Sequence, residues 1–544
     1  MTDAVPSLPV SISEKARTAP NRIAIESIST DEQISWRQLD QTCRLWADAF
    51  RRLGVEAGQP VITLLPNTPD ATYAWLGCAW LRAIEVPVNP DFRGEWLTHA
   101  INTAQAPVVV TSARIAPSLA RVAERLDRVE TVVIHDATTG DGASNDDLRA
   151  LHRSFRVVEG PEFFAGAEPA DDLSDPQVWD IMSAIYTSGT TGPAKAVLLP
   201  WGLLEDTHLL FSPPEFQNAV FYSFWPSFHT LGKSHLSAAA ALDGKLVHRE
   251  HVSVTDFWDD IRTYDCTVAF TVSVIANLLY GEPERDDDAD NPLRAVIMGP
   301  VIPEVDDFKR RFGVKVYTTF GSTEVGSALY SFMRDVDSSN WQSCGRVVPE
   351  SLTEVAVVDE HDIPVGPGSL GELIVRPKQP WVMNLGYLNM PEATVRAWRN
   401  GWYHTGDAFV FDENGEHYFV DRTTDYIRRR GENISSFEVE HAVCELPGVA
   451  QAAAVAVPAD IGEDEVMVFV LPEPGTALDP AELIESLVDR VPDFALPRYL
   501  EIVDELPTTQ ATFRVQKRKL RERGPGPSTF DRLQRTGHLH ESEA

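Results

Sequence analysis

The chain has few cysteines and no long apolar run, and both absences restrict what it can be. Its 544 residues include five cysteines without a C-x-x-C pair or a metal-ligand spacing, which favours reduced thiols over a disulfide framework. The longest apolar stretch, near residues 268–280, is shorter than the roughly 20 helical residues that span a bilayer. The N-terminus shows no basic segment followed by an apolar one, so no secretory signal is predicted. We therefore expect a cytoplasmic protein without membrane insertion.

Basic residues are scarce relative to acidic ones. The 47 Lys and Arg residues stand against 81 Asp and Glu residues, which gives a formal net charge of -34. Such a charge disfavours nonspecific binding to nucleic acid or to an anionic membrane, and an anionic ligand must be attracted by local cations. We expect small-molecule partners and no nucleic acid.

Residues 186–195 (YTSGTTGPAK) do not fit the common P-loop, G-x-x-x-x-G-K-[ST], yet they have the composition of a phosphate-binding loop. The segment lies between two expected strands, at 181–186 and 196–199. Its glycines can bring backbone N–H groups close to an anion, and Lys195 adds a positive charge. Taken alone, such a hydroxyl-rich loop is more often a plain hairpin turn. Other motifs decide between these interpretations.

Three further segments place a carboxylate or an arginine near turns that contain glycine. Residues 317–326 (YTTFGSTEVG) include Glu324, which can bind Mg²⁺ through oxygen. Residues 401–407 (GWYHTGD) end in Asp407, which can accept both hydrogen bonds of a ribose diol. The planar guanidinium of Arg422 can bridge ribose and phosphate oxygens. Each residue alone is also explained as a turn residue or a solvated surface residue.

In this order the segments resemble the motifs of adenylate-forming enzymes, the superfamily of acyl-CoA synthetases, peptide-synthetase adenylation domains and firefly luciferase. The resemblance covers the chain from about residue 10 to about residue 522. It is nearest to the crotonobetaine/carnitine-CoA ligase-like branch, because residues 428–440 (RRRGENISSFEVE) are very like the loop beyond the hinge of that branch. The resemblance implies an AMP-producing, ATP-dependent ligase that uses Mg²⁺, with CoA as co-substrate.

The resemblance also implies roles for individual residues. The implied catalytic residues are Lys195, His229, Glu324 and Arg514, with Glu324 as the metal ligand. His229 lies in residues 225–232 (WPSFHTLG), where relatives have a histidine beside the substrate and the pantetheine tunnel; a packed or solvated loop histidine is the alternative. The implied nucleotide-binding residues are Thr187, Ser188, Gly189, Thr190, Thr191, Gly299, Phe320, Gly321, Ser322, Thr323, Asp407 and Arg422.

Two departures from the family pattern fall in the C-terminal part. Arg514 aligns with the lysine that contacts the reacting carboxylate and the α-phosphate in relatives, and its broad fork changes the contact geometry. Lys517 and Lys519 are alternatives for this role, and a basic run that only coats the surface is another. Thr424 stands where relatives carry an Asp or Lys hinge residue.

Short apolar runs alternate with helical patterns, which is typical of an α/β fold with largely parallel sheets. We expect a large N-terminal AMP-binding domain, residues 1–423, of stacked α/β subdomains plus a β-rich subdomain near 355–376. A small, mobile α+β C-terminal domain, 424–524, and a disordered tail, 525–544, should follow. The expected parallel strands lie at 60–65, 107–111, 131–135, 268–272, 295–298 and 314–319.

The resemblance implies adenylation of a carboxylic acid with release of pyrophosphate, then transfer to CoA with domain alternation. We expect the acid to be small or flat. The limit on size comes from residues 295–303, which stand where relatives have a segment that lines adenine and substrate. In this predicted substrate wall Met298 and Pro300 are bulkier than the residues of relatives. The branch that the chain resembles includes ATP-dependent diazotases of biosynthetic pathways, so the resemblance also implies one alternative, a diazotase that adenylates nitrite and transfers the nitrosyl group to an aryl amine. A non-catalytic nucleotide-binding protein is disfavoured, because the residues that carry the chemistry are present.

Overall fold

The computed structural model describes residues 6–136, 145–187, 194–204, 216–331, 336–422, 427–429, 432–434, 436–459, 464–488, 490–491, 495–508 and 515–533. The chain divides into two compact units, Met1–Val355 with Val375–His404, and Ala356–Ile374 with Thr405–Ala544. The domain boundary that we expect after residue 423 stays a prediction. None of the helices in the described ranges combines the length and apolarity that a membrane crossing requires.

The larger sheet of the first unit is parallel except at one edge. Its strand order is β14-β13-β12-β10-β11-β1-β2, and the pairing of β1 with β2 is antiparallel. Strands β12 and β13 are buried at every position, as expected where helices cover both faces. The bounds are β1 (Ile23–Ser27), β2 (Glu32–Ser35), β10 (Val220–Ser223), β11 (Lys245–His248), β12 (Val268–Thr271), β13 (Ala295–Met298), β14 (Lys315–Tyr317), α9 (Thr230–Ala241), α10 (Phe257–Thr263), α11 (Ser273–Gly281) and α12 (Val305–Phe312).

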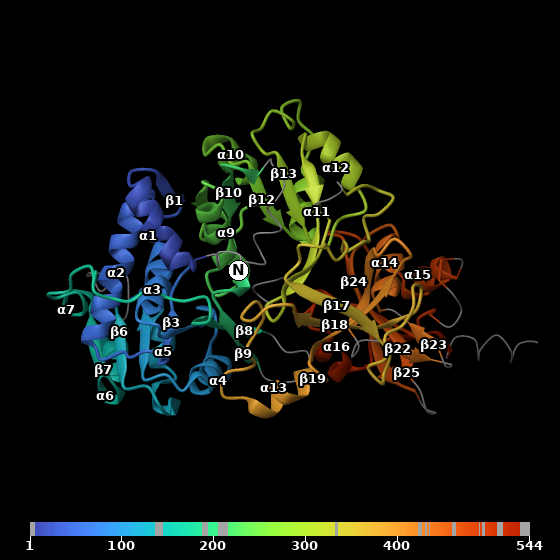
Figure 1. The fold of residues 1–544 in the computed structure, drawn as a ribbon. Helices are drawn as coiled ribbons and strands as arrows, with labels where there is room; N and C mark the ends of the chain where they lie inside the picture. The colour runs from blue at the N-terminus through green and yellow to red at the C-terminus, as the bar shows by residue number, and fades with distance from the viewer. Residues whose placement is uncertain are drawn as a thin grey trace, which may run out of the picture. The chain divides into compact units, whose positions relative to one another are not determined.

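The second sheet of the first unit is parallel throughout, in the order β4-β3-β5-β6-β7. Helices α1, α2 and α3, blue in Figure 1, lie side by side. The two sheets confirm the predicted α/β fold with largely parallel strands. The bounds are α1 (Leu8–Thr18), α2 (Trp36–Arg52), β3 (Pro60–Leu64), α3 (Pro69–Trp80), β4 (Ile84–Pro87), α4 (Gly94–Ala104), β5 (Val108–Thr111), α5 (Ala116–Ala120), β6 (Thr131–Ile134), α6 (Asn145–Ser154), β7 (Arg156–Glu159) and α7 (Gly160–Phe163).

Two antiparallel hairpins of the first unit carry predicted nucleotide motifs. Strands β8 (Ile181–Thr187) and β9 (Lys195–Pro200) flank the phosphate loop, and β15 (Thr319–Ser322) pairs with β16 (Gly326–Tyr330). The second hairpin requires two glycines. A Cβ atom on Gly321 would lie 2.1 Å from the carbonyl oxygen of Gly326, and Gly326 itself has a φ of +68°.

The strands after residue 353 form the predicted β-rich region. Their order is β17-β18-β20-β19, and β21 also pairs with β20. Helix α13 (Pro391–Ala397) precedes β19 along the chain. The strand bounds are β17 (Thr353–Val358), β18 (Gly371–Pro377), β19 (Trp398–Arg399), β20 (Trp402–Phe411) and β21 (His417–Arg422).

The C-terminal part of the second unit is a small α+β structure, as predicted. Its mixed sheet has the order β24-β25-β26-β27. Asp479 caps α15 by accepting hydrogen bonds from the backbone N–H groups of Ala481 and Glu482, which confirms the predicted start of that helix. The bounds are β22 (Ile427–Arg429), β23 (Glu432–Ile434), α14 (Ser436–Cys444), β24 (Val449–Pro458), β25 (Asp464–Pro472), α15 (Pro480–Leu487), β26 (Tyr499–Ile502), α16 (Lys517–Arg523) and β27 (Phe530–Asp531).

The stretch after residue 524 differs from the disordered tail that we expected. Strand β27 pairs antiparallel with β26, and Phe530 packs against the core. The hydroxyls of Ser528 and Thr529 donate to the buried carboxylate of Glu501, at 3.0 and 2.7 Å. A buried acid on β26 therefore orders a segment with little apolar content of its own. Residues 534–544 lie outside the described residues.

Candidate functional site

The β8–β9 hairpin fixes the two ends of the predicted phosphate loop. Thr187 and Lys195 are opposite residues in its pairing register. Predicted residues Ser188, Gly189, Thr190 and Thr191 lie in the loop between them, outside the described part of the chain. On its other side β9 meets residues 384–388, where Val197 pairs with Tyr387 in an antiparallel bridge. The hairpin thus places Lys195 beside a segment almost 200 residues further along the chain.

Lys195 and Glu324 lie around the same tyrosine. The Lys195 ammonium is 5.2 Å from the centre of the Tyr387 ring, within the range of a cation–π contact. The Tyr387 hydroxyl donates to Glu324 Oε1 at 3.4 Å and lies 3.0 Å from the hydroxyl of Tyr403. Both tyrosines are buried. The structure therefore brings together the predicted loop lysine and the predicted metal ligand.

The backbone around Glu324 is held from a distant segment. The backbone N–H and the side-chain amide of Asn384 both donate to the Glu324 carbonyl oxygen, at 3.1 and 2.8 Å. The Glu324 N–H donates to Ser322 Oγ at 3.2 Å. Phe320, Gly321, Ser322 and Thr323, predicted to bind the nucleotide, lie in β15 and the turn that follows it. Sequence reasoning missed Asn384 and Tyr387. Their only sequence signal is Gly386, a turn-forming residue that lies between them in the chain.

The surroundings of Glu324 fit a magnesium ion that shares its ligands with phosphate. In the described ranges no three His, Cys, Asp or Glu side chains gather as a metal-binding group. Mg²⁺ commonly takes one or two carboxylates, with substrate phosphates and water as its other ligands. Glu324 beside the phosphate-loop lysine has this character.

Of the two bulky residues in the predicted substrate wall, residues 295–303, only one is exposed. Gly299 follows β13, and its N–H donates to the Thr271 carbonyl at 3.2 Å. Met298 is fully buried in the main core of the unit, so its bulk serves core packing. Pro300 is exposed. The size argument for a small or flat substrate therefore rests on Pro300 and no longer on Met298.

His229 stands at the N-terminus of α9. Its N–H donates to the Pro226 carbonyl at 2.9 Å, and a Cβ atom on Gly232 would lie 2.2 Å from that same oxygen, so the turn needs glycine. Burial lowers the pKa of His229 to about 4, which keeps the ring neutral at physiological pH. Within the described residues its Nε2 is buried without a hydrogen-bond partner. Such an atom is normally satisfied, so a ligand atom is a suitable partner.

Asp407 and Arg422, predicted to hold the nucleotide, belong to the second unit. They are direct cross-strand neighbours in the antiparallel pair of β20 and β21. Asp407 is buried, and its N–H donates to Thr405 Oγ1 at 3.0 Å. The Thr405 hydroxyl in turn donates to the Leu373 carbonyl at 2.6 Å. The backbone of Asp407, the residue predicted to bind the ribose, is therefore held in place by hydrogen bonds.

The predicted catalytic Arg514 and the hinge residue Thr424 lie outside the described residues. Lys517, one alternative to Arg514, is engaged within its own unit. Its ammonium is 2.8 Å from Glu440 Oε1 and also donates to Ser436 Oγ. Lys519 is exposed on α16. Lys517 therefore has partners within its own unit, and the role of Arg514 stays a prediction.

Comparison with known proteins gives the same picture. Residues 12–388 match the family "AMP-binding enzyme", and residues 438–512 match "AMP-binding enzyme C-terminal domain". The chain is 28% identical over 494 residues to a crotonobetaine/carnitine–CoA ligase of Salmonella agona (strain SL483), which covers 87% of this chain and 90% of that protein. A protein of the same name from Citrobacter koseri is 28% identical over 495 residues, with the same coverage.

Solved structures resemble the fold. An anthranilate CoA ligase in complex with anthranoyl-AMP has a TM-score of 0.81 at 19% identity, over 95% of this chain and 97% of that chain. A benzoate CoA ligase from Burkholderia xenovorans LB400 has a TM-score of 0.79 at 21% identity, over 95% and 100%. At these identities the likeness concerns the fold alone.

Proposed function

Because this chain belongs to the AMP-binding enzyme family, and so is an ATP-dependent adenylate-forming ligase, we propose that it activates a carboxylic acid and transfers the acyl group to CoA. The observation that carries the proposal is the convergence of Lys195 and Glu324 on Tyr387. A cation beside a magnesium-binding carboxylate suits the triphosphate of ATP. CoA as acceptor is supported by the names of the relatives.

In the first step a carboxylate oxygen attacks the α-phosphorus of ATP, and pyrophosphate leaves. Charge then develops on the α-phosphate and on the leaving group. Lys195 and a magnesium ion at Glu324 would stabilise that charge, as preorganised cations do in phosphoryl transfer. Asp407 would accept hydrogen bonds from the ribose hydroxyls, and Arg422 would bind ribose and phosphate oxygens.

His229 has a different part in this proposal. Its neutral ring and unpartnered Nε2 suit a hydrogen bond to the organic substrate, and a general base of low pKa would be weak at neutral pH. Arg514 would contact the α-phosphate during adenylation only. The second step, attack of the CoA thiol on the acyl-adenylate with release of AMP, would follow rotation of the C-terminal domain.

The diazotase reaction is a second candidate, because it shares the adenylation step and differs in the substrates. In that reaction a nitrite oxygen attacks the α-phosphorus, and the nitrosyl group then passes to an aryl amine. The substitution of arginine for the family lysine at position 514 favours it. Pro300, exposed at the predicted wall, suits a small substrate in either case.

Mass spectrometry of the products separates the candidates. One reaction set contains ATP, Mg²⁺, CoA and one acid from a panel of crotonobetaine, carnitine, anthranilate and benzoate. A parallel set contains ATP, Mg²⁺, nitrite and an aryl amine. We expect AMP, pyrophosphate and an acyl-CoA in the first set. A diazonium product only in the second set would favour the diazotase, and AMP in neither set would contradict both.

A further inference from the structure

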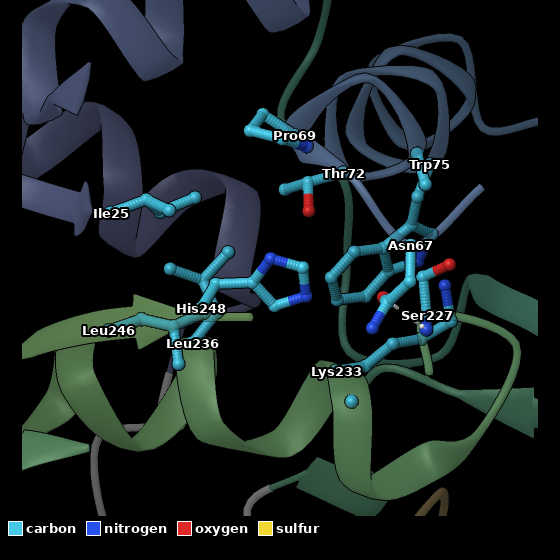
Figure 2. Close-up of a pocket in the computed structure, with 12 residues that line it drawn as sticks. Ile25, Asn67, Pro69, Thr72, Trp75, Ser227, Lys233, Leu236, Leu246 and His248 are labelled. Carbon is cyan, nitrogen blue, oxygen red and sulfur yellow. Dashed lines mark hydrogen bonds between the residues drawn. The ribbon is translucent and has the colours of Figure 1, made fainter. Parts of the chain in front are cut away.

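An ion pair of the first unit, Lys233 with Glu85, is almost completely buried. Lys233 of α9 lies 2.8 Å from Glu85 Oε2 of β4, and the two side chains are only 2% and 1% exposed. The ammonium also lies 4.1 Å from the centre of the Trp75 ring of α3. Figure 2 shows Lys233 extending from its helix toward Trp75. Both residues line a cavity of about 20 Å³. That volume holds about one water molecule.

Glu85 collects further hydrogen bonds from two strands. Thr63 of β3 donates its hydroxyl to Oε1 at 3.0 Å. Ser183 of β8 donates its hydroxyl to Oε2, the oxygen that also accepts from Lys233. A single carboxylate thus joins four elements, β3, β4, β8 and α9, through charged or charge-assisted contacts.

Two of these contacts lead directly to the candidate site. Ser183 precedes Thr187, the last described residue before the phosphate loop, by four residues on the same strand. Lys233 follows His229 by four residues, about one turn of α9. Glu85 therefore connects the strand that delivers the phosphate loop to the helix that presents the substrate-side histidine.

Stability alone does not account for such a pair. Removing two charges from water costs about as much as their attraction returns, and well-packed apolar residues often replace a buried pair without loss. A hydrogen-bonded pair, unlike an apolar contact, fixes direction as well as distance. Ser183 and Lys233 on the same oxygen set the offset of β8 relative to α9.

We propose that Glu85 and Lys233 are positioning residues that hold the phosphate-loop strand and the substrate helix in the relative position that adenylation requires. This proposal rests on the proposed function. Neither residue contacts the reacting atoms in this account, and both act through Thr187, the phosphate loop and His229.

Two hydroxyl deletions on the same carboxylate give the sharpest test. Ser183→Ala removes the hydrogen bond on the strand that leads to the phosphate loop, and Thr63→Val removes the one on β3, which carries no site residue. Binding of MgATP and of AMP to the full chain is measured by titration calorimetry. We expect Ser183→Ala to raise the Kd of MgATP roughly 2- to 30-fold, and that of AMP less. Thr63→Val should leave both values unchanged.

The pair itself is tested with Glu85→Gln and Lys233→Met, alone and combined. Each single variant leaves a buried partner without its counter-charge and should lower Tm. The double variant should recover Tm and yet keep a MgATP Kd at least about tenfold above wild type, because offset and stability are separate properties. The control is Glu26→Gln with Lys245→Met, a Lys–Glu pair of the same unit 2.6 Å apart between β1 and β11.

The outcomes are distinct. Full recovery of MgATP binding together with Tm in the double variant would show a merely structural pair and overturn the proposal. Equal effects of Ser183→Ala and Thr63→Val would overturn it too, even if the double variant fails to fold. A wild-type chain that binds no MgATP would instead overturn the proposed function, and the positioning role with it.

Discussion

Each unit contains a Lys–Glu pair with the same 2.8 Å separation, and the two pairs differ in burial and in the elements that they contact. Lys233 and Glu85 in the first unit are 2% and 1% exposed, and burial lowers the pKa of Lys233 despite its counter-charge. Lys517 and Glu440 in the second unit are 16% and 18% exposed. Distance alone therefore says little about what a pair does.

The neighbours of each pair decide its consequences. Glu85 binds one strand and one helix that lead to the candidate site, β8 and α9, so its loss should move functional residues. Lys517, the first residue of α16, contacts Glu440 and Ser436 of α14. Loss of the Lys517 side chain should therefore affect the contact between these two helices and little else. Partly exposed pairs of this kind typically contribute about 0–1 kcal/mol.

The largest expected effect belongs to Arg514, which lies outside the described residues and aligns with the family lysine. Arg514→Ala should slow adenylate formation roughly 10- to 1,000-fold, because a cation at the α-phosphate stabilises transition-state charge. Lys517→Ala is the matched control and should change the rate less than about threefold. Pyrophosphate release measures adenylation, and a chemically supplied adenylate measures transfer, which should be nearly unaffected. A large loss in Lys517→Ala alone would show that the alignment is shifted.

Burial on α9 extends to His235, which is 2% exposed and lies 2.9 Å from Ser223 Oγ. Burial lowers its pKa to about 4, below its ordinary value, so the unfolded chain binds a proton first as the pH falls. Stability should therefore be lost between about pH 6.5 and pH 4, by on the order of 3 kcal/mol from this residue. Urea unfolding from pH 7.5 to pH 4.5 checks this.

The control for His235 is His251, which is exposed. His235→Gln should flatten the dependence of stability on pH, whereas His251→Gln should leave the slope as it is. If the free energy of unfolding depends on pH equally in both variants, the loss of stability at low pH does not come from His235.

In the second unit, Asp407→Ala should raise the KM for ATP about 10- to 100-fold, since charge-assisted hydrogen bonds are worth about 1.5–3 kcal/mol. A comparison with 2′-deoxy-ATP sharpens the test. The wild-type protein should bind 2′-deoxy-ATP more weakly than ATP, whereas Asp407→Ala should bind the two nucleotides with nearly equal affinity. If the loss of affinity from the substitution and the loss from removing the 2′-hydroxyl add up, Asp407 does not contact the ribose.

In the first unit, Glu324→Gln should raise the Mg²⁺ concentration for half-maximal pyrophosphate release by about tenfold, because a charged ligand is replaced by a neutral one. Tyr387→Phe removes only the hydroxyl 3.4 Å from Glu324 Oε1 and should raise that concentration about two- to fivefold. Mg²⁺ titrations of both variants give the comparison. If Glu324→Gln needs the same Mg²⁺ concentration as wild type, Glu324 is not a ligand of the metal.

Local patterns predicted much of the fold and of the hairpins and turns that carry the candidate site residues. The phosphate-loop hairpin, the turn at Glu324 and the cap of α15 depend on residues close in sequence, so glycines and short polar residues identified them. Met298 appeared as a wall residue, because sequence alone does not show which face of β13 packs against the core. The ordered segment at Phe530 was missed, since it depends on Glu501 and β26.

The supports of the site could not be predicted in the same way. Tyr387 meets Glu324 from 63 residues away, and Lys233 meets Glu85 from 148 residues away. Each of these residues has an ordinary structural explanation on its own. Only the packing of distant elements gives them a part in the site.

Oxygen transfer tests the central claim, that an acid oxygen attacks the α-phosphorus, most directly. The accepted acid, or nitrite, is labelled with ¹⁸O on its oxygens, and the AMP formed is examined by mass spectrometry. Adenylation followed by transfer predicts AMP that carries a single ¹⁸O atom from the acid. Unlabelled AMP, or ADP in its place, would contradict the account.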